Sequence, residues 1–157
     1  MRFQVVPAAY VYLLRTRDGR DEVLLQQRRN TGYRDGHWAA GAAGHVEAGE
    51  SVHAAARRET REELGVDAAR IEPLTVLHRT DGTPDPIEQR VDFMFTAREW
   101  SGEPATQEHH KVADLRWFPL DALPDPLVPH ERYVLEHLRA GDLAPVVAIG
   151  FPDTDPA

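Results

Sequence analysis

Hydrophobic and polar positions along the chain alternate between short apolar segments and polar, turn-forming ones. The apolar segments are rich in Val, Leu, Ile, Phe and Tyr and are bounded by Gly, Pro, Asp or Asn, which is typical of β-strands. The first two are separated by the turn-like sequence Arg17-Asp18-Gly19-Arg20. The strands predicted in this way are residues 3–15, 22–28, 71–78, 90–96 and 113–118.

Two segments have the pattern of amphipathic helices instead. The first is predicted over residues 52–64, because Ser51 is a favourable N-cap and Gly65 stands where a C-terminal glycine ends a helix. Its mostly apolar stripe, with one residue every four positions, would pack on a sheet and consists of Val52, Ala56, Thr60 and Leu64. The second helix is predicted over residues 130–139, directly after Pro129.

The first predicted helix also has an acidic face. Glu59, Glu62 and Glu63 project within an arc of roughly 100° on one side of it. Like charges at this spacing repel one another, so the face requires compensation. A divalent cation is the simplest source, and the alternative is a solvated face on which the glutamates pair with arginines of the same helix. Residues 41–44 just upstream are predicted to form a loop whose small side chains let backbone carbonyls approach a metal or a phosphate.

Composition and charge restrict the possible functions. The 157 residues suffice for one domain with a sizeable core, and the absence of cysteine excludes a thiolate nucleophile, disulfides and cysteine-ligated zinc. A net charge of −8 argues against a nucleic-acid polymer as partner. The apolar run from Val5 to Leu14 contains Pro7 and is too short to span a membrane, and it lacks the layout of a signal peptide. We therefore expect a cytoplasmic protein that does not associate with membranes.

From Gly44 to Val66, the spacing of the glycines, the arginine and the glutamates resembles the Nudix box, the signature of the Nudix hydrolase family. The one departure is Thr60, where the family usually has an aliphatic residue. The resemblance implies an α/β fold, a three-layer α/β/α sandwich with a mixed β-sheet, which strands flanked by helices on both sides would also form. It further implies a single Nudix hydrolase domain over residues 1–150. Residues 151–157 are expected to form a frayed tail, as chain ends commonly do.

The resemblance also implies a metal site for Mg²⁺ or Mn²⁺. Arg58 matches the arginine that orients the first of the metal-binding glutamates, whereas Glu50 is expected to brace the loop by pairing with an arginine. Carboxylate and carbonyl oxygens are the ligands that such hard cations prefer. Glu108 falls near the place where some members supply a further metal-binding carboxylate, and the alternative for it is a solvated loop residue. The implied metal ligands are Gly44, Glu59, Glu62, Glu63 and Glu108.

The activity implied is attack of a metal-activated water on a phosphorus of a diphosphate linkage. The metal lowers the pKa of the water and neutralises charge on the phosphate oxygens, while an ionised carboxylate accepts the proton. The implied catalytic residues are Glu62, Glu59 and Arg58. Glu62 is the first choice for the base, and Glu59 is its rival because the base has moved between positions within the family.

Substrate contacts are predicted at three positions around the box. Arg29 ends the second strand, where the family often has an arginine that reaches the phosphates, and the alternative is a solvated strand end. His45 follows Gly44 directly, and Trp38 resembles the aromatic residue that often precedes the box. The stretch over residues 39–43 lacks the usual Leu-Pro, which leaves the shape of the substrate loop open.

The substrate itself is predicted by elimination. The secondary marks of the ADP-ribose, dinucleoside-polyphosphate and coenzyme A subgroups are missing. This leaves a nucleoside triphosphate, oxidised ones included, which would be cleaved to the monophosphate and pyrophosphate as in the MutT-like branch. The alternatives are a sugar nucleotide, an isoprenoid diphosphate, or a nucleotide sensor without catalysis, although such sensors commonly lose box carboxylates and this chain keeps them. A homodimer is left open.

Overall fold

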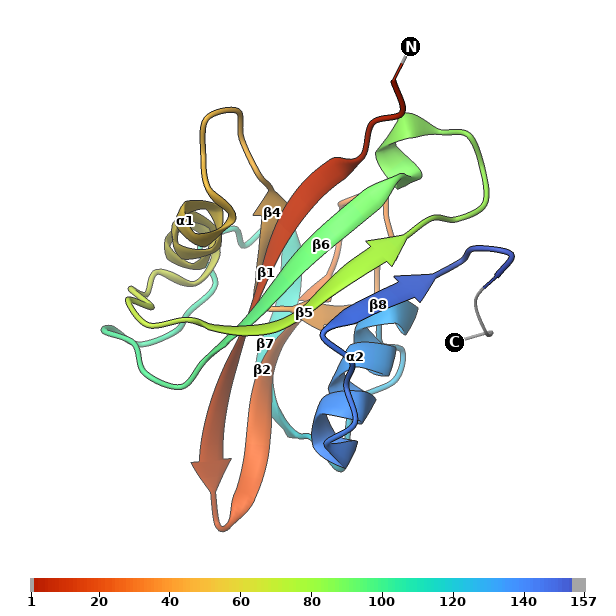
Figure 1. Cartoon of the computed structure of the whole chain (residues 1–157). Coiled ribbons are helices and arrows are strands. Elements are labelled where there is room, and N and C mark those ends of the chain that lie inside the picture. Colours follow the sequence, from red (N-terminus) through yellow and green to blue (C-terminus); the bar gives the residue numbers. More distant parts are fainter. Residues whose placement is uncertain (1, 154–157) are drawn as a thin grey trace.

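The structure is a computed structural model that describes residues 2–153 of the chain. Two helices, one short 3₁₀ helix and eight strands follow one another as in Figure 1. In chain order they are β1 (Val6–Arg17), β2 (Arg20–Arg28), β3 (Trp38–Ala40), β4 (Ala42–His45), α1 (Val52–Leu64), β5 (Glu72–Arg79), η1 (Pro86–Glu88), β6 (Arg90–Ala97), β7 (Val112–Pro119), α2 (Pro129–Ala140) and β8 (Val146–Ile149).

All eight strands belong to one mixed sheet. Its central path runs in the order β3-β2-β1-β6-β5-β8, while β4 pairs with β1 and β7 pairs with β2. The β1–β6 and β5–β8 pairs are parallel, and the others are antiparallel. Along one edge, β1 pairs first with β4 over residues 8–11 and then with β2 over residues 14–17. The sheet therefore forks at β1, which brings the start of the box near the end of β2.

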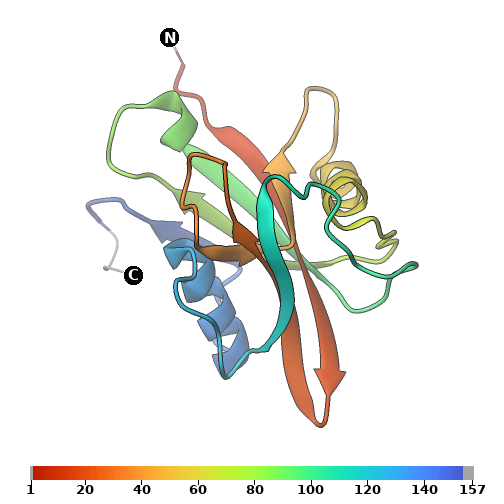
Figure 2. The same ribbon diagram turned by 180° about the vertical axis from the view of Figure 1, so that it is seen from behind.

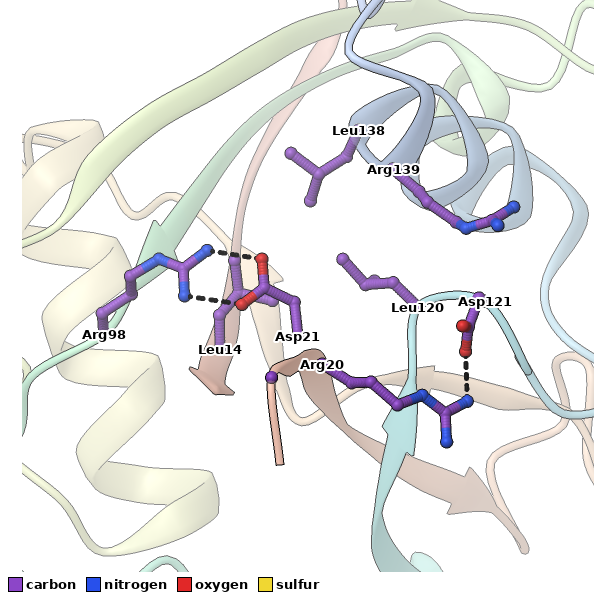
Figure 3. Close-up of a pocket in the computed structure, with 9 residues that line it drawn as sticks. Leu14, Arg20, Asp21, Arg98, Leu120, Asp121, Leu138 and Arg139 are labelled. Carbon is purple, nitrogen blue, oxygen red and sulfur yellow. Dashed lines mark hydrogen bonds and ion pairs between the residues drawn. The ribbon is translucent and has the colours of Figure 1, made fainter. Parts of the chain in front are cut away.

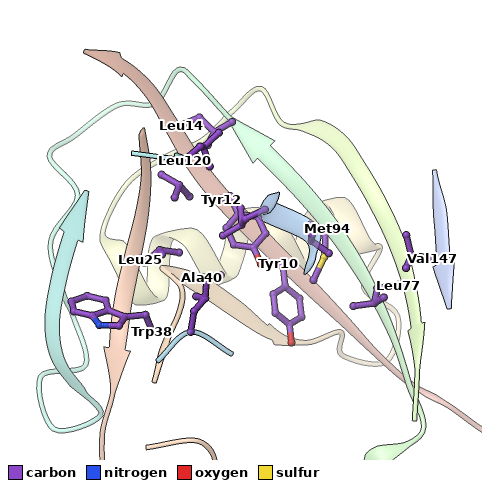
Figure 4. Close-up of a cluster of buried hydrophobic side chains, with 14 of the residues drawn as sticks. Tyr10, Tyr12, Leu14, Leu25, Trp38, Ala40, Leu77, Met94, Leu120 and Val147 are labelled. Carbon is purple, nitrogen blue, oxygen red and sulfur yellow. The ribbon is translucent and has the colours of Figure 1, made fainter. Parts of the chain in front are cut away.

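Alternate side chains of β1 enter two different cores, because successive residues of a strand point to opposite faces of the sheet. The core under α2 contains Tyr10, Tyr12, Leu14, Val134 and Leu135 (Figure 4). The core under α1 contains Val11, Leu13, Ala55, Ala56 and Leu64. The two helices lie on opposite faces of the sheet, as the opposite views in Figures 1 and 2 show. The predicted three-layer α/β/α sandwich with a mixed sheet is confirmed.

The ends of α1 are those predicted from the sequence. The Ser51 hydroxyl accepts a hydrogen bond from the Ala54 N–H at 3.0 Å, and Gly65 ends the helix in the left-handed conformation with φ of 70°. Thr60 is fully buried on the packed stripe, and its hydroxyl donates to the Ala56 carbonyl at 2.7 Å. The buried hydroxyl is therefore satisfied within the helix, so Thr60 fits a position that is usually aliphatic. Within residues 2–153, neither helix has the length and apolar character that crossing a membrane requires.

Three predictions of local structure need correction. Residues 42–44, predicted as a loop, belong to β4, because the backbone of β1 pairs with these small residues despite their weak strand propensity. The strands β3 and β8 were not predicted, because segments of three and four residues are too short to show a clear period and depend on pairing with their partners. Phe151 packs against the ring of His78, with centroids 4.5 Å apart, so the predicted frayed tail does not begin there. Residues 154–157 of that tail lie outside the described part of the chain.

A buried carboxylic acid joins α2 to the sheet. Glu131, in the first turn of α2, is only 2% exposed. One of its oxygens, Oε1, accepts hydrogen bonds from the Tyr12 hydroxyl at 2.6 Å and from the Ala40 N–H at 2.8 Å. Burial raises the pKa of Glu131 to about 7, although both hydrogen bonds oppose this effect. The Glu131 carboxyl group thus serves as a hydrogen-bond acceptor, and its ionised form is disfavoured in the folded protein.

We expect Glu131→Gln to keep the fold and to remove part of the pH dependence of stability. Because the folded pKa of Glu131 is raised above its unfolded value, its contribution to stability is fully present at low pH and is lost as pH rises to about 7. Gln retains an oxygen acceptor without the charge, whereas Glu131→Ala leaves the Ala40 N–H unpaired and should cost about 1–3 kcal/mol of unfolding free energy. Urea denaturation between pH 5 and pH 8 tests this, and an unchanged pH profile in Glu131→Gln would contradict it.

Candidate active site

One guanidinium group organises the acidic face of α1. Arg58 donates to both oxygens of Glu50, with Nε–Oε2 at 2.7 Å and Nη2–Oε1 at 3.0 Å. Its Nη1 donates to Glu59 Oε1 at 2.8 Å and to Glu62 Oε2 at 3.2 Å, and Nη2 also reaches the His45 carbonyl at 3.2 Å. The contacts predicted for Glu50 and for the first metal-binding glutamate are therefore present. Arg58 compensates part of the negative charge that the helix concentrates here.

Glu59 lies directly against the backbone of the box glycine. A Cβ atom at Gly44 would collide with the Glu59 carboxylate, and the three atoms nearest to it all belong to that side chain. Burial raises the pKa of Glu59, and the negative charges of Glu62 and Glu108 raise it further, against the opposing effect of Arg58. The absence of a side chain at Gly44 is thus what allows a carboxylate to lie beside the β4 backbone.

Glu63 is the most strongly perturbed carboxylate of the site. Its Oε2 accepts a hydrogen bond from the Ala43 N–H at 2.6 Å, and a side-chain hydrogen bond from Gln26 adds to this. Burial nevertheless raises the pKa of Glu63 to about 8, and the charges of Glu59 and Glu108 contribute in the same direction. The carboxylates of Glu59, Glu63 and Glu108 therefore act on one another, and their charges are only partly neutralised by protein groups.

A loop that docks on the end of α1 brings Glu108 to this cluster. The Ala105 and Gln107 N–H groups donate to the carbonyls of Leu64 and Glu63 at 3.0 Å and 3.1 Å. Glu108 and Glu63 then share a cavity of about 280 Å³, which we call the acidic cavity. Its walls include Gln26, Arg28, Ala43, Glu63, Glu108 and Lys111.

The donor set fits a hard divalent cation. Carboxylate oxygens with uncompensated negative charge, close to a backbone that carries no side chain, are suitable ligands for Mg²⁺ or Mn²⁺. Within residues 2–153, the structure does not gather three Asp, Glu or His side chains at metal-binding distances. The reason is that Arg58 holds Glu59 and Glu62 while Ala43 holds Glu63. A cation would compete with these protein contacts for the same carboxylate oxygens.

Arg28, rather than Arg29, faces the acidic cavity. The Arg29 guanidinium donates to the His109 carbonyl, and Arg29 is not among the cavity-lining residues of the described chain. Arg28 is fixed by hydrogen bonds to the Tyr33 carbonyl at 2.8 Å and to the Thr31 hydroxyl at 3.1 Å. The sequence contained a signal for this placement of Arg28. Side chains two positions apart on a strand share a face, and Arg28 stands two positions after Gln26, which also lines the cavity.

His45 and Trp38 have different surroundings. His45 lines a second cavity of about 310 Å³, which we call the arginine cavity and whose walls include Tyr10, Arg28, His45, Arg79, Glu88 and Arg90. Trp38 is 6% exposed and packs edge-on against Phe118 in the core, with ring centroids 4.7 Å apart. This burial does not fit the substrate contact predicted for Trp38. Sequence reasoning missed Arg79 and Arg90, because only the pairing of β5 with β6 places them opposite each other.

A third cavity, of about 250 Å³, lies at the β1–β2 turn beside the end of α2 (Figure 3). Four of its five charged side chains, all except Arg139, neutralise one another in pairs. Asp21 accepts from Arg98 at 3.1 Å and 3.2 Å, and Asp121 accepts from Arg20. The acidic cavity differs in this respect, because its two carboxylates, Glu63 and Glu108, act on one another through their charges. We therefore place the candidate active site at the acidic cavity and not at this turn.

The fold is an α/β/α sandwich, and an arginine on its first helix braces a row of glutamates beside a glycine-bearing strand. This combination is that of the Nudix hydrolase domains. The family model of the NUDIX domain matches residues 5–138, and the chain belongs to this family.

Two curated relatives and one solved structure illustrate the similarity. The chain is 38% identical over 135 residues to the NAD-capped RNA hydrolase NudC of Pseudomonas aeruginosa, covering 81% of the chain and 44% of the relative. It is 35% identical over 133 residues to the human 8-oxo-dGDP phosphatase NUDT18, covering 83% and 38%. The chain thus spans less than half the length of these relatives. A MutT NUDIX hydrolase from Burkholderia pseudomallei superposes with a TM-score of 0.73 at 34% identity, covering 85% of this chain and 97% of that one.

We expect Gly44→Ala to preserve the fold and to weaken divalent-cation binding by about 10-fold to 100-fold, because the new methyl group displaces the Glu59 carboxylate. Titration with Mn²⁺, followed by electron paramagnetic resonance, measures the affinity without requiring turnover. The matched control is the same substitution in a Glu59→Ala background, where the methyl group has no carboxylate to displace and should change little. An equal loss in both backgrounds would show that the effect does not pass through Glu59.

Proposed function

We propose that the protein is a metal-dependent hydrolase that cleaves a diphosphate linkage in a nucleoside diphosphate derivative. The observation that carries this proposal is the Arg58 guanidinium, which holds Glu50, Glu59 and Glu62 beside the acidic cavity. An arrangement that only stabilised the helix would pair its charges, as the arginines and aspartates at the β1–β2 turn do. Here Glu63 and Glu108, whose charges act on one another, line a cavity together with Arg28 and Lys111, whose charges suit phosphate oxygens.

The residues take distinct roles in this proposal. Glu59, Glu63, Glu108 and the Gly44 carbonyl hold Mg²⁺ or Mn²⁺, which when bound neutralises phosphate charge and lowers the pKa of a water molecule. Glu62 accepts the proton, since its side chain is 56% exposed and Arg58 holds it by one oxygen at 3.2 Å. Glu59 is the rival base, because its raised pKa brings it nearer to the range of an efficient proton acceptor.

The substrate proposed first is a nucleoside triphosphate, normal or oxidised, which is cleaved to a monophosphate and pyrophosphate. The relatives named for NAD-capped RNA and for 8-oxo-dGDP support the coarser class, because both names include a nucleoside diphosphate unit. The net charge of −8 favours a small nucleotide over an RNA polymer, since a polymer brings many phosphates to an acidic surface. Because one relative is named for NAD-capped RNA, a capped RNA end still belongs among the substrates to test, beside nucleoside triphosphates.

The proposal is tested by turnover of nucleoside triphosphates, 8-oxo-dGTP, ADP-ribose, NADH and an NAD-capped oligonucleotide with Mg²⁺ or Mn²⁺. We expect hydrolysis of at least one of these that stops after exhaustive EDTA treatment and returns with added metal. Glu62→Gln should lower kcat by about 10² to 10⁴, the range for loss of a general base. Activity that survives EDTA would refute metal dependence, whereas near-normal kcat in Glu62→Gln would move the base to Glu59.

We expect Glu108→Gln to raise the Mg²⁺ concentration needed for half-maximal activity and to lower kcat/KM about 10-fold to 100-fold, because Glu108 shares the acidic cavity with Glu63. Glu103→Gln is the matched control, since Glu103 is exposed in the same loop and is not among the cavity residues. Metal titrations of the rate compare the two variants. Superimposable curves for Glu108→Gln and the unmodified protein would remove Glu108 from the site.

A further inference from the structure

The arginine cavity adjoins the acidic cavity but has the opposite character. Arg28 and Ala43 line both cavities, so the two are neighbours at the end of β2. The arginine cavity extends from there over the α2 side of the sheet, where Arg79 on β5 lies opposite Arg90 on β6. A group attached to a diphosphate in the acidic cavity would therefore have this second cavity beside it.

A buried carboxylate lies beside two of the arginines and holds one of them by a hydrogen bond. Asp92 is fully buried, and its Oδ2 accepts from Arg79 Nε at 2.5 Å. Its Oδ1 lies 3.8 Å from Arg90 Nη2, beyond hydrogen-bonding distance, and has no hydrogen-bond partner among residues 2–153. Arg90 Nε is likewise buried without a partner in that range. The protein thus leaves donor capacity on Arg90 unused.

The cavity is locally positive although the chain is strongly negative. Arg28, Arg79 and Arg90 contribute three guanidinium groups, against the carboxylates of Asp92 and Glu88. The hydrogen bonds of Arg28 go to neutral oxygens and leave its charge unpaired.

We propose that the arginine cavity binds a phosphate monoester carried by the group that is linked to the diphosphate, and that the protein prefers substrates with this additional phosphate. Guanidinium groups match phosphate oxygens in charge and in the geometry of their paired donors. Asp92 fixes Arg79 in advance, so less side-chain freedom is lost when the anion binds. This inference rests on the proposed hydrolase function, but the binding it describes can be measured without turnover.

The test compares ligands that differ by one phosphate. Adenosine 2′,5′-bisphosphate and AMP are titrated calorimetrically in EDTA, and NADPH and NADH, or ADP-ribose 2′-phosphate and ADP-ribose, are compared as substrates with Mg²⁺. We expect the phosphorylated member of each pair to have a lower Kd or KM by about 10-fold, the effect of a charged hydrogen bond.

Variants assign the preference to the cavity. Arg90→Gln should reduce it to about twofold or less and Arg90→Lys should retain part of it, because lysine keeps the charge without the paired donors. Arg98→Gln is the charge-matched control, since Arg98 pairs with Asp21 at the distant cavity. Equal affinities within each pair, or a preference that Arg90→Gln leaves intact, would overturn the inference. If none of the substrates is hydrolysed while the bisphosphate still binds tighter in EDTA, the hydrolase proposal fails and the binding site stands.

Discussion

The interaction on which the site depends is the contact between the Arg58 guanidinium and three carboxylates. Glu50 from the preceding loop takes up two of its donors, and Glu59 and Glu62 share a third. Without this cation, the glutamates of one helix face would repel one another in a partly buried place. Because Arg58 also reaches the His45 carbonyl, the same group fixes the position of α1 relative to β4. The compensation is incomplete, which leaves charge for a cation to neutralise.

Burial determines the chemistry of the carboxylates more than their number does. Glu63 at the site and Glu131 in the first turn of α2 each accept a hydrogen bond from a backbone N–H, yet burial raises the pKa of both. Their consequences differ because their surroundings differ. Glu131 lies in a closed core, where its hydrogen bonds join a helix to the sheet, whereas Glu63 borders a cavity in which other carboxylates act on it. Glu131 therefore joins parts of the fold through its hydrogen bonds, whereas Glu63 is a candidate ligand at the edge of a cavity.

The forked sheet explains how cavities of opposite charge lie side by side. Since β1 changes its partner from β4 to β2, Arg28 at the end of β2 meets Ala43 on β4 and contributes to both cavities. Glutamates on the α1 side and arginines on the α2 side thus line neighbouring cavities. An anion with charge at two separated positions would find a cation-binding region and an arginine region within a single ligand's reach.

The sequence by itself determined the box helix, its caps and the acidic face, because these depend on residues a few positions apart that interact within one element. It also determined the three-layer class of the fold, since strands and helices alternate with clear periodicities. The tertiary structure decided the rest. Only strand pairing could show that residues 42–44 form β4, that Arg79 faces Arg90, and that Trp38 lies in the core. These contacts join distant parts of the chain, and local patterns carry no record of which backbone will pair with which.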